Sequence, residues 1–407
     1  MSLTRNQIIV IGVAGLLILI LILIFAGILP GLKEEDPRFN IRTNLEFWGV
    51  FDNVEAYNAA LAAYKETYPG VVVNYRRFAS VADYERALLD ALAAGQGPDV
   101  FMLHSRDLPR DVNKLAPVAA AKFTILGLRN LFPQVVESDF VSKGAIYALP
   151  LSIDTLALYY NRQHFDQAAI TSPPKTWEEF EAALPKLKGV AIENAPDIVS
   201  LLMLQSGTAM VNDSFTRATF DSREGEDALN FYVKFAEPES PVALDTFAEG
   251  EVSMTFNYAS AASRVRAKAP SLNFAVSDAP QPQRAQAAIA YPDYWGYAVS
   301  RQSRKQNLAW DFILALTANR NNAKFYIDRT GRPPALRSMI DEKLNDPVLN
   351  VFARQALIAR SWPQADPDEV SKIFSEMVRS VISGGESVSE ALDAAEKEVT
   401  RLMERRL

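Results

Sequence analysis

Strands and helices alternate along the chain after residue 43, and this pattern constrains the fold more than any other feature. Short apolar runs rich in β-branched and aromatic residues read TNLEFWGV, VVVNYRRF and GPDVFML, as buried strands do. Between them, apolar residues recur at helical spacing, as in DYERALLDALAAG. This alternation predicts an α/β fold, with a parallel sheet covered by helices. Ligands of such sheets bind beyond the carboxyl ends of the strands, which singles out the segments at 48–52 and 104–107.

The apolar run from Ile8 to Leu29 carries no charged residue. As a helix it would be about 33 Å long, enough to cross a hydrocarbon core of about 30 Å. A cleaved signal peptide usually has an apolar region of about 7–15 residues followed by a small-residue cleavage site. We therefore interpret residues 1–30 as an uncleaved transmembrane anchor rather than a signal peptide, and residues 31–43 as a linker. Arg5 favours an inside N-terminus, so we expect a single-pass protein of the cell membrane with its main body outside the cytoplasm.

Composition excludes several classes of protein. The chain has 407 residues, of which 49% are hydrophobic and 22% charged, as in globular proteins. A net charge of -7 without a basic cluster argues against nucleic-acid binding. Cysteine is absent and only His104 and His164 represent histidine, so disulfides, zinc–thiolate sites and multi-histidine metal sites cannot form. No acid–base or nucleophile motif stands out, and we expect neither an enzyme nor a cofactor or metal site.

Six motifs follow one another along the chain: AAGQGPDVFML, YALPLSIDTLALYYNRQHF, PPKTWEEFEAAL, FAEGEVSMTFNYAS, WGYAVS and TGRPPAL. Each alone is weak, because KTWEEF, for example, is only the capped start of a helix. Together, and at this spacing, they resemble the family 1 extracellular solute-binding proteins, the maltose-binding-protein-like carriers of ABC importers. The resemblance runs from about Asn44 to the C-terminus.

The resemblance implies a two-lobed periplasmic-binding-protein type II fold with a central cleft, here preceded by one transmembrane helix. It assigns residues 44–151 and 299–337 to lobe 1, and 152–297 and 338–407 to lobe 2. The chain would cross between the lobes near Leu151-Ser152, Trp295-Gly296 and Arg332-Pro334. The implied partners are a small-molecule ligand in the cleft, a sugar or polyol, and the transmembrane permease subunits of an ABC transporter.

Candidate ligand contacts are polar and aromatic residues that follow predicted strands or lie at the implied crossings. They are Trp48, Asp52, His104, Ser105, Arg106, Ser152, Asp154, Asn257, Tyr258, Tyr294, Trp295 and Arg332. Aromatic rings pack against the C–H face of a sugar, and charged or amide groups pair with its hydroxyls. Asp154 raises the sharpest question, because a lone carboxylate in an apolar run is costly unless something pairs with it.

Each candidate also has a structural interpretation. The aromatic rings could belong to the core, Asp52 could cap the helix that follows it, and Asn257 could be a turn residue. Arg106 could pair with Asp107 or Asp154 instead of a ligand, and the arginine of GRPP could hold the third crossing. These alternatives stay open at the level of the sequence.

Three functions compete. The first is a membrane-tethered receptor that captures a sugar-like solute by lobe closure and delivers it to an ABC permease. The second is a sensor of the same fold that signals to a membrane partner. The third, a surface glycoside hydrolase, needs two carboxylates about 5–9 Å apart. Asp52 with Asp154 is the pair to test for it.

Overall fold

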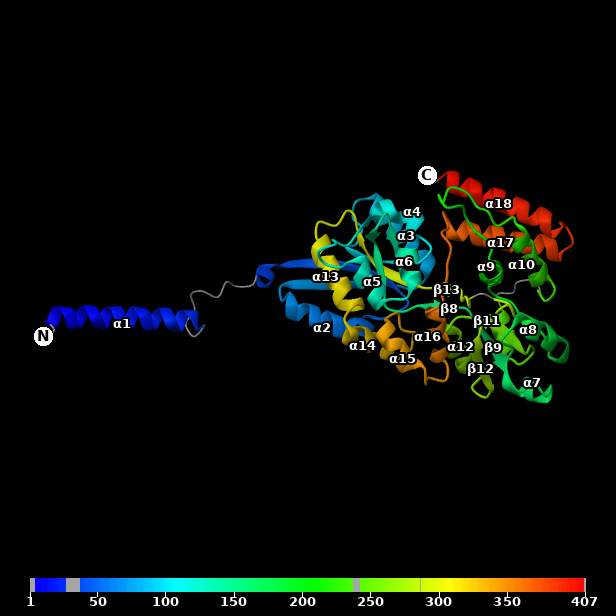
Figure 1. Ribbon diagram of the computed structural model, residues 1–407, viewed down its shortest axis with the longest axis horizontal. Helices are drawn as coiled ribbons and strands as arrows, with labels where there is room; N and C mark the ends of the chain where they lie inside the picture. Colours follow the sequence, from blue (N-terminus) through cyan, green and yellow to red (C-terminus); the bar gives the residue numbers. More distant parts are fainter. Residues whose placement is uncertain (1–3, 27–36, 237–241, 286, 406–407) are drawn as a thin grey trace. The chain divides into compact units, whose positions relative to one another are not determined.

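The computed structural model describes residues 4–26, 37–236, 242–285 and 287–405 (Figure 1). The chain divides into two compact units. The first comprises Met1–Asn44 with Tyr64–Val72, and the second comprises Leu45–Ala63 with Val73–Leu407. All of the chemistry discussed below lies in the second unit.

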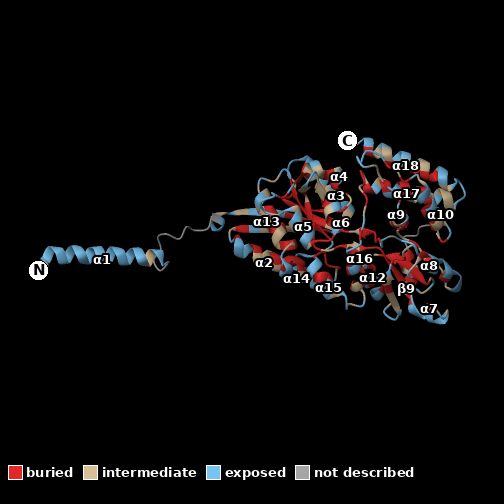
Figure 2. Ribbon diagram, in the orientation of Figure 1, coloured by how far each residue is buried: buried red, intermediate tan, exposed pale blue. Residues whose placement is uncertain are grey.

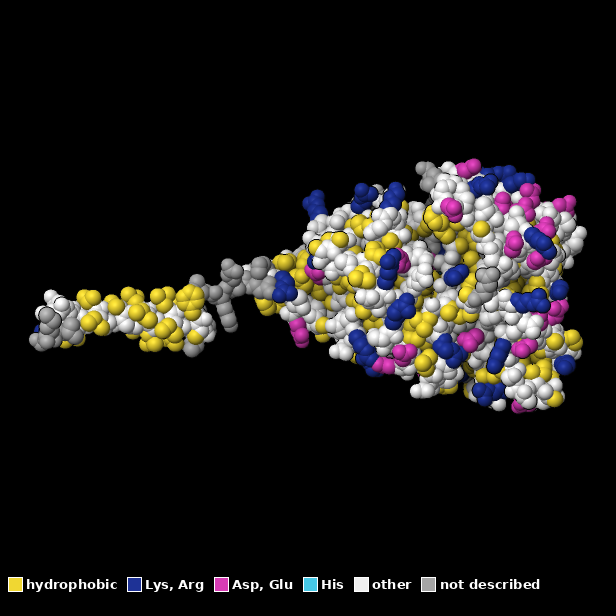
Figure 3. Space-filling view, viewed as in Figure 1, with side chains coloured by type: hydrophobic (Ala, Val, Ile, Leu, Met, Phe, Trp, Pro, Cys, Tyr) yellow, Lys and Arg dark blue, Asp and Glu magenta, His cyan; other side chains and the backbone are white. Residues whose placement is uncertain are grey.

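Helix α1 spans Arg5–Phe25 in the first unit, and it contains no buried residue. Hydrophobic side chains cover its visible face in Figure 3. Among the described residues, α1 is the one helix long and apolar enough to cross a membrane, a test that a signal sequence also passes. The predicted apolar run ends at Leu29, and its last three residues lie outside the described part of the chain, as do residues 31–36 of the predicted linker.

The first sheet has the strand order β2-β1-β3-β14-β4, with β7 also paired to β14. Its strands are β1 (Thr43–Val50), β2 (Val71–Phe78), β3 (Val100–His104), β4 (Leu115–Ala116), β7 (Ala148–Pro150) and β14 (Trp295–Ser300). Strands β1 and β3 are parallel, as the alternation predicts, whereas β14 returns from far along the chain and runs antiparallel to β3. The last four residues of β1 are all buried, because a central strand is covered on both faces.

The second sheet has the order β10-β11-β9-β12. Its strands are β9 (Ala157–Asn161), β10 (Val190–Ala191), β11 (Met254–Asn257) and β12 (Phe274–Asp278). Successive residues of β9 enter different hydrophobic clusters: Leu158 packs with Trp177 and Phe256, and Tyr159 packs with Phe247 and others. Side chains alternate across a strand, so this sheet is also buried on both faces, and Figure 2 shows β9 as buried.

Helices cover both sheets. They are α2 (Asn58–Thr67), α3 (Val81–Ala93), α4 (Leu108–Asp111), α5 (Ile125–Leu131), α6 (Gln134–Phe140), α7 (Arg162–Gln167), α8 (Trp177–Ala183), α9 (Ala195–Gln205), α10 (Arg223–Val233), α11 (Ala243–Ala248), α12 (Ser260–Lys268), α13 (Gln306–Thr317), α14 (Arg320–Thr330), α15 (Arg337–Lys343), α16 (Leu349–Ala356), α17 (Pro367–Ile382) and α18 (Val388–Glu404). The predicted capped helix start in KTWEEF is confirmed, because Thr176 accepts a hydrogen bond from the backbone N–H of Glu179. Ser387 caps α18 in the same way by accepting from the N–H of Glu390.

Three chain segments lie side by side where the two sheets are connected. Strand β8 (Asp154–Thr155) pairs antiparallel with β13 (Pro292–Asp293), and Asp154 stands directly opposite Asp293. On the other side, Ser152 forms a β-bridge with Pro334. These segments carry the chain between the sheets, and β14 already belongs to the first sheet from Trp295 onward.

Candidate functional site

A cavity of about 210 Å³ lies where the connecting segments meet both sheets. Its lining comes from loops after β1 and β11, from β3 and β14, from α14 and from the three connecting segments. The residues are Phe51, Asp52, Met102, Leu151, Ser152, Asp154, Tyr258, Ser260, Asp293, Tyr294, Trp295, Tyr297, Tyr326 and Arg332. Parts of the chain up to 280 residues apart therefore build one site, as the Asp52–Arg332 contact illustrates.

The cavity brings together seven of the twelve predicted ligand contacts. These are Asp52, Ser152, Asp154, Tyr258, Tyr294, Trp295 and Arg332. The other five, Trp48, His104, Ser105, Arg106 and Asn257, lie outside its lining. Their roles as ligand contacts stay predictions, and the structure shows what each one touches within the chain.

Asp52 is held by neighbours on its own chain. Its Oδ1 lies 3.1 Å from Nη2 of Arg332, and its Oδ2 accepts a hydrogen bond of 2.8 Å from the hydroxyl of Tyr326. Its backbone carbonyl accepts a further hydrogen bond from Tyr75. The helical turn after it is preceded by Asn53 and has no side-chain cap. Asp52 therefore anchors the loop after β1 to α14 and the third connecting segment.

The partners of Asp154 are backbone amides. Its two carboxylate oxygens lie 3.0 Å from the N–H of Ala259, at the start of α12, and Oδ1 also accepts from the N–H of Thr155. Burial raises the pKa of Asp154 to about 7, although these two N–H groups hold it down, and the neighbouring Asp293 raises it further. Near neutral pH this carboxyl can both donate and accept hydrogen bonds.

Asp293 pairs with the side chains of a histidine and an arginine instead. Its Oδ1 lies 2.7 Å from Nε2 of His104 and 2.9 Å from Nη2 of Arg106. Burial opposes ionisation, but the charges and hydrogen bonds of His104 and Arg106 outweigh it, so the pKa of Asp293 lies well below its usual range. Asp293 is thus a fixed carboxylate that can only accept hydrogen bonds.

Arg106 extends this network to the second sheet. Its Nη1 donates to Oδ1 of Asp197 in α9 at 3.1 Å, and the other oxygen of Asp197 accepts a hydrogen bond of 2.6 Å from the hydroxyl of Tyr258. Arg106 also lies over the ring of Tyr291, at 5.6 Å. Neither Asp107 nor Asp154, the predicted alternatives, is the partner of Arg106 in these ion pairs. The pairs join the loop after β3 to α9 and to β13 instead.

Two aromatic rings form a corner in the cavity wall. Phe51 and Trp295 have ring centroids 5.9 Å apart and planes inclined by 75°. Trp295 is partly exposed and is supported from behind by Tyr84 and His104, also edge to face. Tyr294 is buried, and its hydroxyl donates to Asp139, so it supports the wall more than it enters the cavity.

A family model described as bacterial extracellular solute-binding protein matches residues 59–349. The chain belongs to this family. As a member, it has relatives over most of its length: a binding protein of Brucella abortus is 22% identical over 365 residues, covering 82% of the chain and 87% of the relative. A maltotriose-binding protein of Pyrococcus abyssi is 23% identical over 308 residues, covering 71% of the chain and 66% of the relative.

Solved structures of binding proteins share the fold of this solute-binding protein. The cyclic alpha-maltosyl-1,6-maltose binding protein of Arthrobacter globiformis has a TM-score of 0.79 and 19% identity, covering 90% of this chain and 100% of that one. A sugar-binding protein of Xanthomonas citri has a TM-score of 0.78 and 20% identity, covering 89% and 98%. The predicted maltose-binding-protein-like family and two-lobed α/β fold are thereby confirmed.

The five predicted residues outside the cavity lining of this solute-binding protein have partners or surroundings of their own. Trp48 is buried beneath Arg76 and Phe78. Asn257 donates to Glu193, and Ser105 is buried behind Tyr294, whose carbonyl accepts its backbone N–H. The remaining two, His104 and Arg106, contact Asp293, which does line the cavity.

Sequence reasoning missed several lining residues, above all Phe51, Asp293 and Tyr326. Asp293 precedes two named candidates in YPDYW, and its place at an implied crossing was a signal that could have found it. Tyr326 lies within α14, and its approach to the cavity depends on packing between segments far apart in sequence. Phe51 follows a buried strand, but the sequence does not show that its backbone turns the ring outward.

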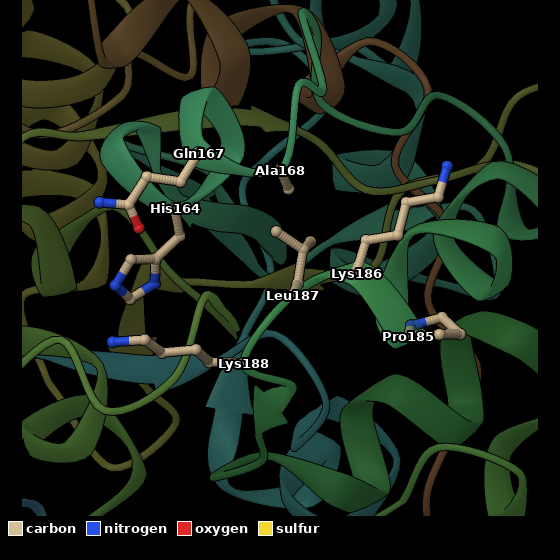
Figure 4. A pocket seen from close by; sticks show the side chains of 7 residues that line it. All are labelled: His164, Gln167, Ala168, Pro185, Lys186, Leu187 and Lys188. Carbon is tan, nitrogen blue, oxygen red and sulfur yellow. The ribbon is translucent and has the colours of Figure 1, made fainter.

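A second hollow of about 250 Å³ lies against α7 and the segment 185–188 (Figure 4). It is lined by His164, Gln167, Ala168, Pro185, Lys186, Leu187 and Lys188. No Phe, Tyr or Trp is among these seven residues, and all of them come from one short stretch of the chain. Burial and the nearby Lys188 lower the pKa of His164. We therefore place the candidate site at the first cavity.

Proposed function

We propose that this solute-binding protein captures a sugar at the cavity of Phe51 and Trp295 and delivers it to an ABC transporter permease. The observation that carries the proposal is the cavity's lining, which combines an aromatic corner with carboxylates of two kinds, Asp154 and Asp293. Aromatic faces and planar polar groups are what recognition of a sugar ring requires. The Pyrococcus and Xanthomonas relatives, named for maltotriose and sugar binding, support this ligand class.

Capture works by closure of two lobes over the ligand. We assign residues 44–151 and 299–337 to one lobe and 152–297 and 338–407 to the other, because each sheet with its helices forms a layered body. The cavity takes Phe51 and Arg332 from the first body and Tyr258 and Trp295 from the second. A sugar that contacts both bodies binds the closed state better than the open one, and its binding energy therefore shifts the population toward closure.

The proposal places the body outside the cytoplasm, held at the cell membrane by α1. With a mean hydropathy of 3.5, α1 satisfies the length and composition of a membrane span. The test is to express the full chain with its N-terminus intact and to determine the mass of the mature protein in the membrane fraction. A mature protein that starts after residue 26 and lies in the soluble fraction would show that the N-terminal segment is a cleaved signal peptide and not an anchor.

Binding is tested by thermal denaturation of the full chain in a detergent without a sugar headgroup. The probes are glucose, tagatose, maltose, maltotriose, glycerol and an amino-acid mixture. A probe at 100 times its dissociation constant stabilises the folded state by about 2.7 kcal/mol. We expect a raised midpoint with a sugar, lost in Trp295→Ala and kept in Phe215→Ala, a matched exposed aromatic outside the cavity. No shift with any sugar would overturn the proposal.

The full chain prepared for the denaturation experiment can also be tested for hydrolysis of a sugar. A glycosidase needs one carboxylate free to attack or to activate water. Both oxygens of Asp52 are engaged by Arg332 and Tyr326, and both oxygens of Asp154 face the N–H of Ala259. We therefore expect maltotriose to be recovered intact after prolonged incubation, as measured by chromatography. Release of glucose would favour the hydrolase.

A further inference from the structure

Phe51 has a backbone conformation that is unusual for a bulky residue. Its φ is 74°, in the region that favours glycine. The N–H of Asp52 donates to the carbonyl of Val50 at 3.0 Å, closing a three-residue turn around Phe51. A positive φ with this hydrogen bond is the mark of the classic γ-turn, which is rare and strained. Glycine would make the same turn without a steric penalty, so the presence of phenylalanine at this position requires an explanation.

Hydrogen bonds and an ion pair of Asp52 hold the turn in place. The Tyr75 hydroxyl donates to the Asp52 carbonyl at 2.7 Å, while Arg332 and Tyr326 hold the Asp52 carboxylate. Strained backbone persists where its surroundings fix it, and it concentrates at functional sites. Asp52 is thus the clamp that keeps Phe51 in its conformation.

The strain turns an aromatic ring toward the cavity. Val50 is 1% exposed, whereas Phe51 next to it is 42% exposed and lines the cavity. One side of its ring is met by the Arg332 guanidinium, with Cζ 5.3 Å from the ring centre, and the ring stands edge to face with Trp295. A perpendicular pair of rings offers a corner into which the C–H face of a sugar ring fits.

We propose that Phe51 contacts the sugar directly, and that the strained turn, clamped through Asp52, exists to present its ring. The inference rests on the proposed sugar-binding function. It adds a ligand contact that is not among the twelve predicted contacts, although it lies in the segment at 48–52 that the strand pattern singles out. It also assigns Asp52, Arg332 and Tyr326 as positioning residues that act through Phe51.

The test uses the full chain and the variants Phe51→Ala, Phe51→Gly and Phe51→Tyr. Dissociation constants for maltose, maltotriose and tagatose are measured by calorimetry, and melting midpoints without sugar give stability. Loss of the ring in the Ala and Gly variants should weaken binding about tenfold, and Tyr, which keeps the ring, should bind like wild type. Without sugar, Phe51→Gly should melt above Phe51→Ala, since glycine accepts a positive φ.

Phe215 supplies the matched control. It is 56% exposed, has a φ of 55° and lies outside the cavity lining. Phe215→Gly should also melt above Phe215→Ala, but neither variant should change sugar binding. If Phe51→Ala binds sugar with the wild-type dissociation constant, the proposed contact between Phe51 and the sugar is wrong. If Phe51→Ala melts at or above the temperature of Phe51→Gly, the proposed backbone strain at residue 51 is wrong. Failure of wild type to bind any of the sugars would instead overturn the proposed function, and the contact with it.

Discussion

Asp154 and Asp293 are the same residue type, stand opposite each other on two paired strands and line the same cavity, yet their ionisation differs in direction. The pKa of Asp154 is raised to about 7, first by burial, whereas the pKa of Asp293 is lowered by His104 and Arg106 against the effect of burial. The strands themselves do not distinguish the two residues. The difference comes from what packs behind each strand: the start of α12 behind β8, and the loop after β3 behind β13.

The comparison assigns different roles to the two carboxyls. Like charges directly opposite each other on paired strands are unfavourable, and the pair avoids this because one member ionises much more readily than the other. Near neutral pH the cavity then presents one fixed acceptor, Asp293, and one group that exchanges its proton, Asp154. A sugar hydroxyl, which both donates and accepts, can be bonded by either.

The largest effect is expected when Asp293 loses its guanidinium partner. Arg106→Ala leaves Asp197 and Asp293 without the cation that joins them, and only 13% of the Arg106 side chain is exposed. Removing one partner of a buried pair costs about 3–5 kcal/mol, because the other charge stays buried. We expect the free energy of unfolding, measured with urea on the full chain, to fall by the lower end of that range.

The control is Arg86→Ala, which breaks the ion pair with Asp83, whose two side chains are 73% and 54% exposed. Such surface pairs contribute about 0–1 kcal/mol, so this variant should unfold nearly as wild type does. If both substitutions lowered the free energy of unfolding equally, the network behind β13 would contribute no more than a surface ion pair. The contrast drawn between Asp154 and Asp293 would then not hold.

The second effect is a pH dependence set by Asp154. Its folded-state pKa of about 7 lies above the ordinary value near 4, so the folded state holds the proton more tightly between those values. Its stabilising contribution is complete below about pH 4 and is lost as the pH rises through 7. Between pH 5 and 7 this amounts to about 2–3 kcal/mol at most. Asp139, with a pKa raised to about 6 by burial, adds a slope of the same sign.

Asp154→Asn removes this titration. Melting midpoints of the full chain from pH 5 to 7 should therefore fall less steeply in the variant than in wild type, and the remaining slope should come from Asp139 and from other carboxyls whose pKa burial raises, such as Asp107 and Glu85. Asp139→Asn is the counterpart that should leave the Asp154 contribution in place. Parallel slopes in wild type and Asp154→Asn would show that Asp154 ionises normally in the folded state.

The sequence predicted the fold better than it predicted the site. Strand–helix alternation and the ordered motifs are local signals, and the helix start at Thr176 depends on a residue three positions on, Glu179. The site depends on which segments meet. In β1, alternation could not tell Trp48 from its neighbours, because the last four residues are buried on both faces.

The role of a single carboxylate was harder still to predict. Asp154 was singled out as an unpaired charge awaiting a ligand, and within the chain it meets the N–H groups of Thr155 and Ala259. Ala259 lies about 100 residues away in sequence, so no local pattern shows this contact. Phe51 was missed because a positive φ depends on contacts of Asp52 with Tyr75, Tyr326 and Arg332, and leaves no mark in the sequence around it.

The smallest effect tests the coupling between the two aspartates directly. Asp293→Asn removes the negative charge opposite Asp154 while keeping the shape of the side chain, and the Asp293 charge is one of the causes that raise the pKa of Asp154. We expect the pKa of Asp154, followed by carbon-13 NMR of labelled aspartate, to fall, because a like charge disfavours ionisation. Asp197→Asn is the matched control: it also removes a carboxylate from the Arg106 network, but not the one opposite Asp154. An unchanged pKa of Asp154 in Asp293→Asn would mean that the two carboxyls differ only through their separate surroundings, burial at Asp154 and the contacts with His104 and Arg106 at Asp293. The pairing across β8 and β13 would then have no part in their difference.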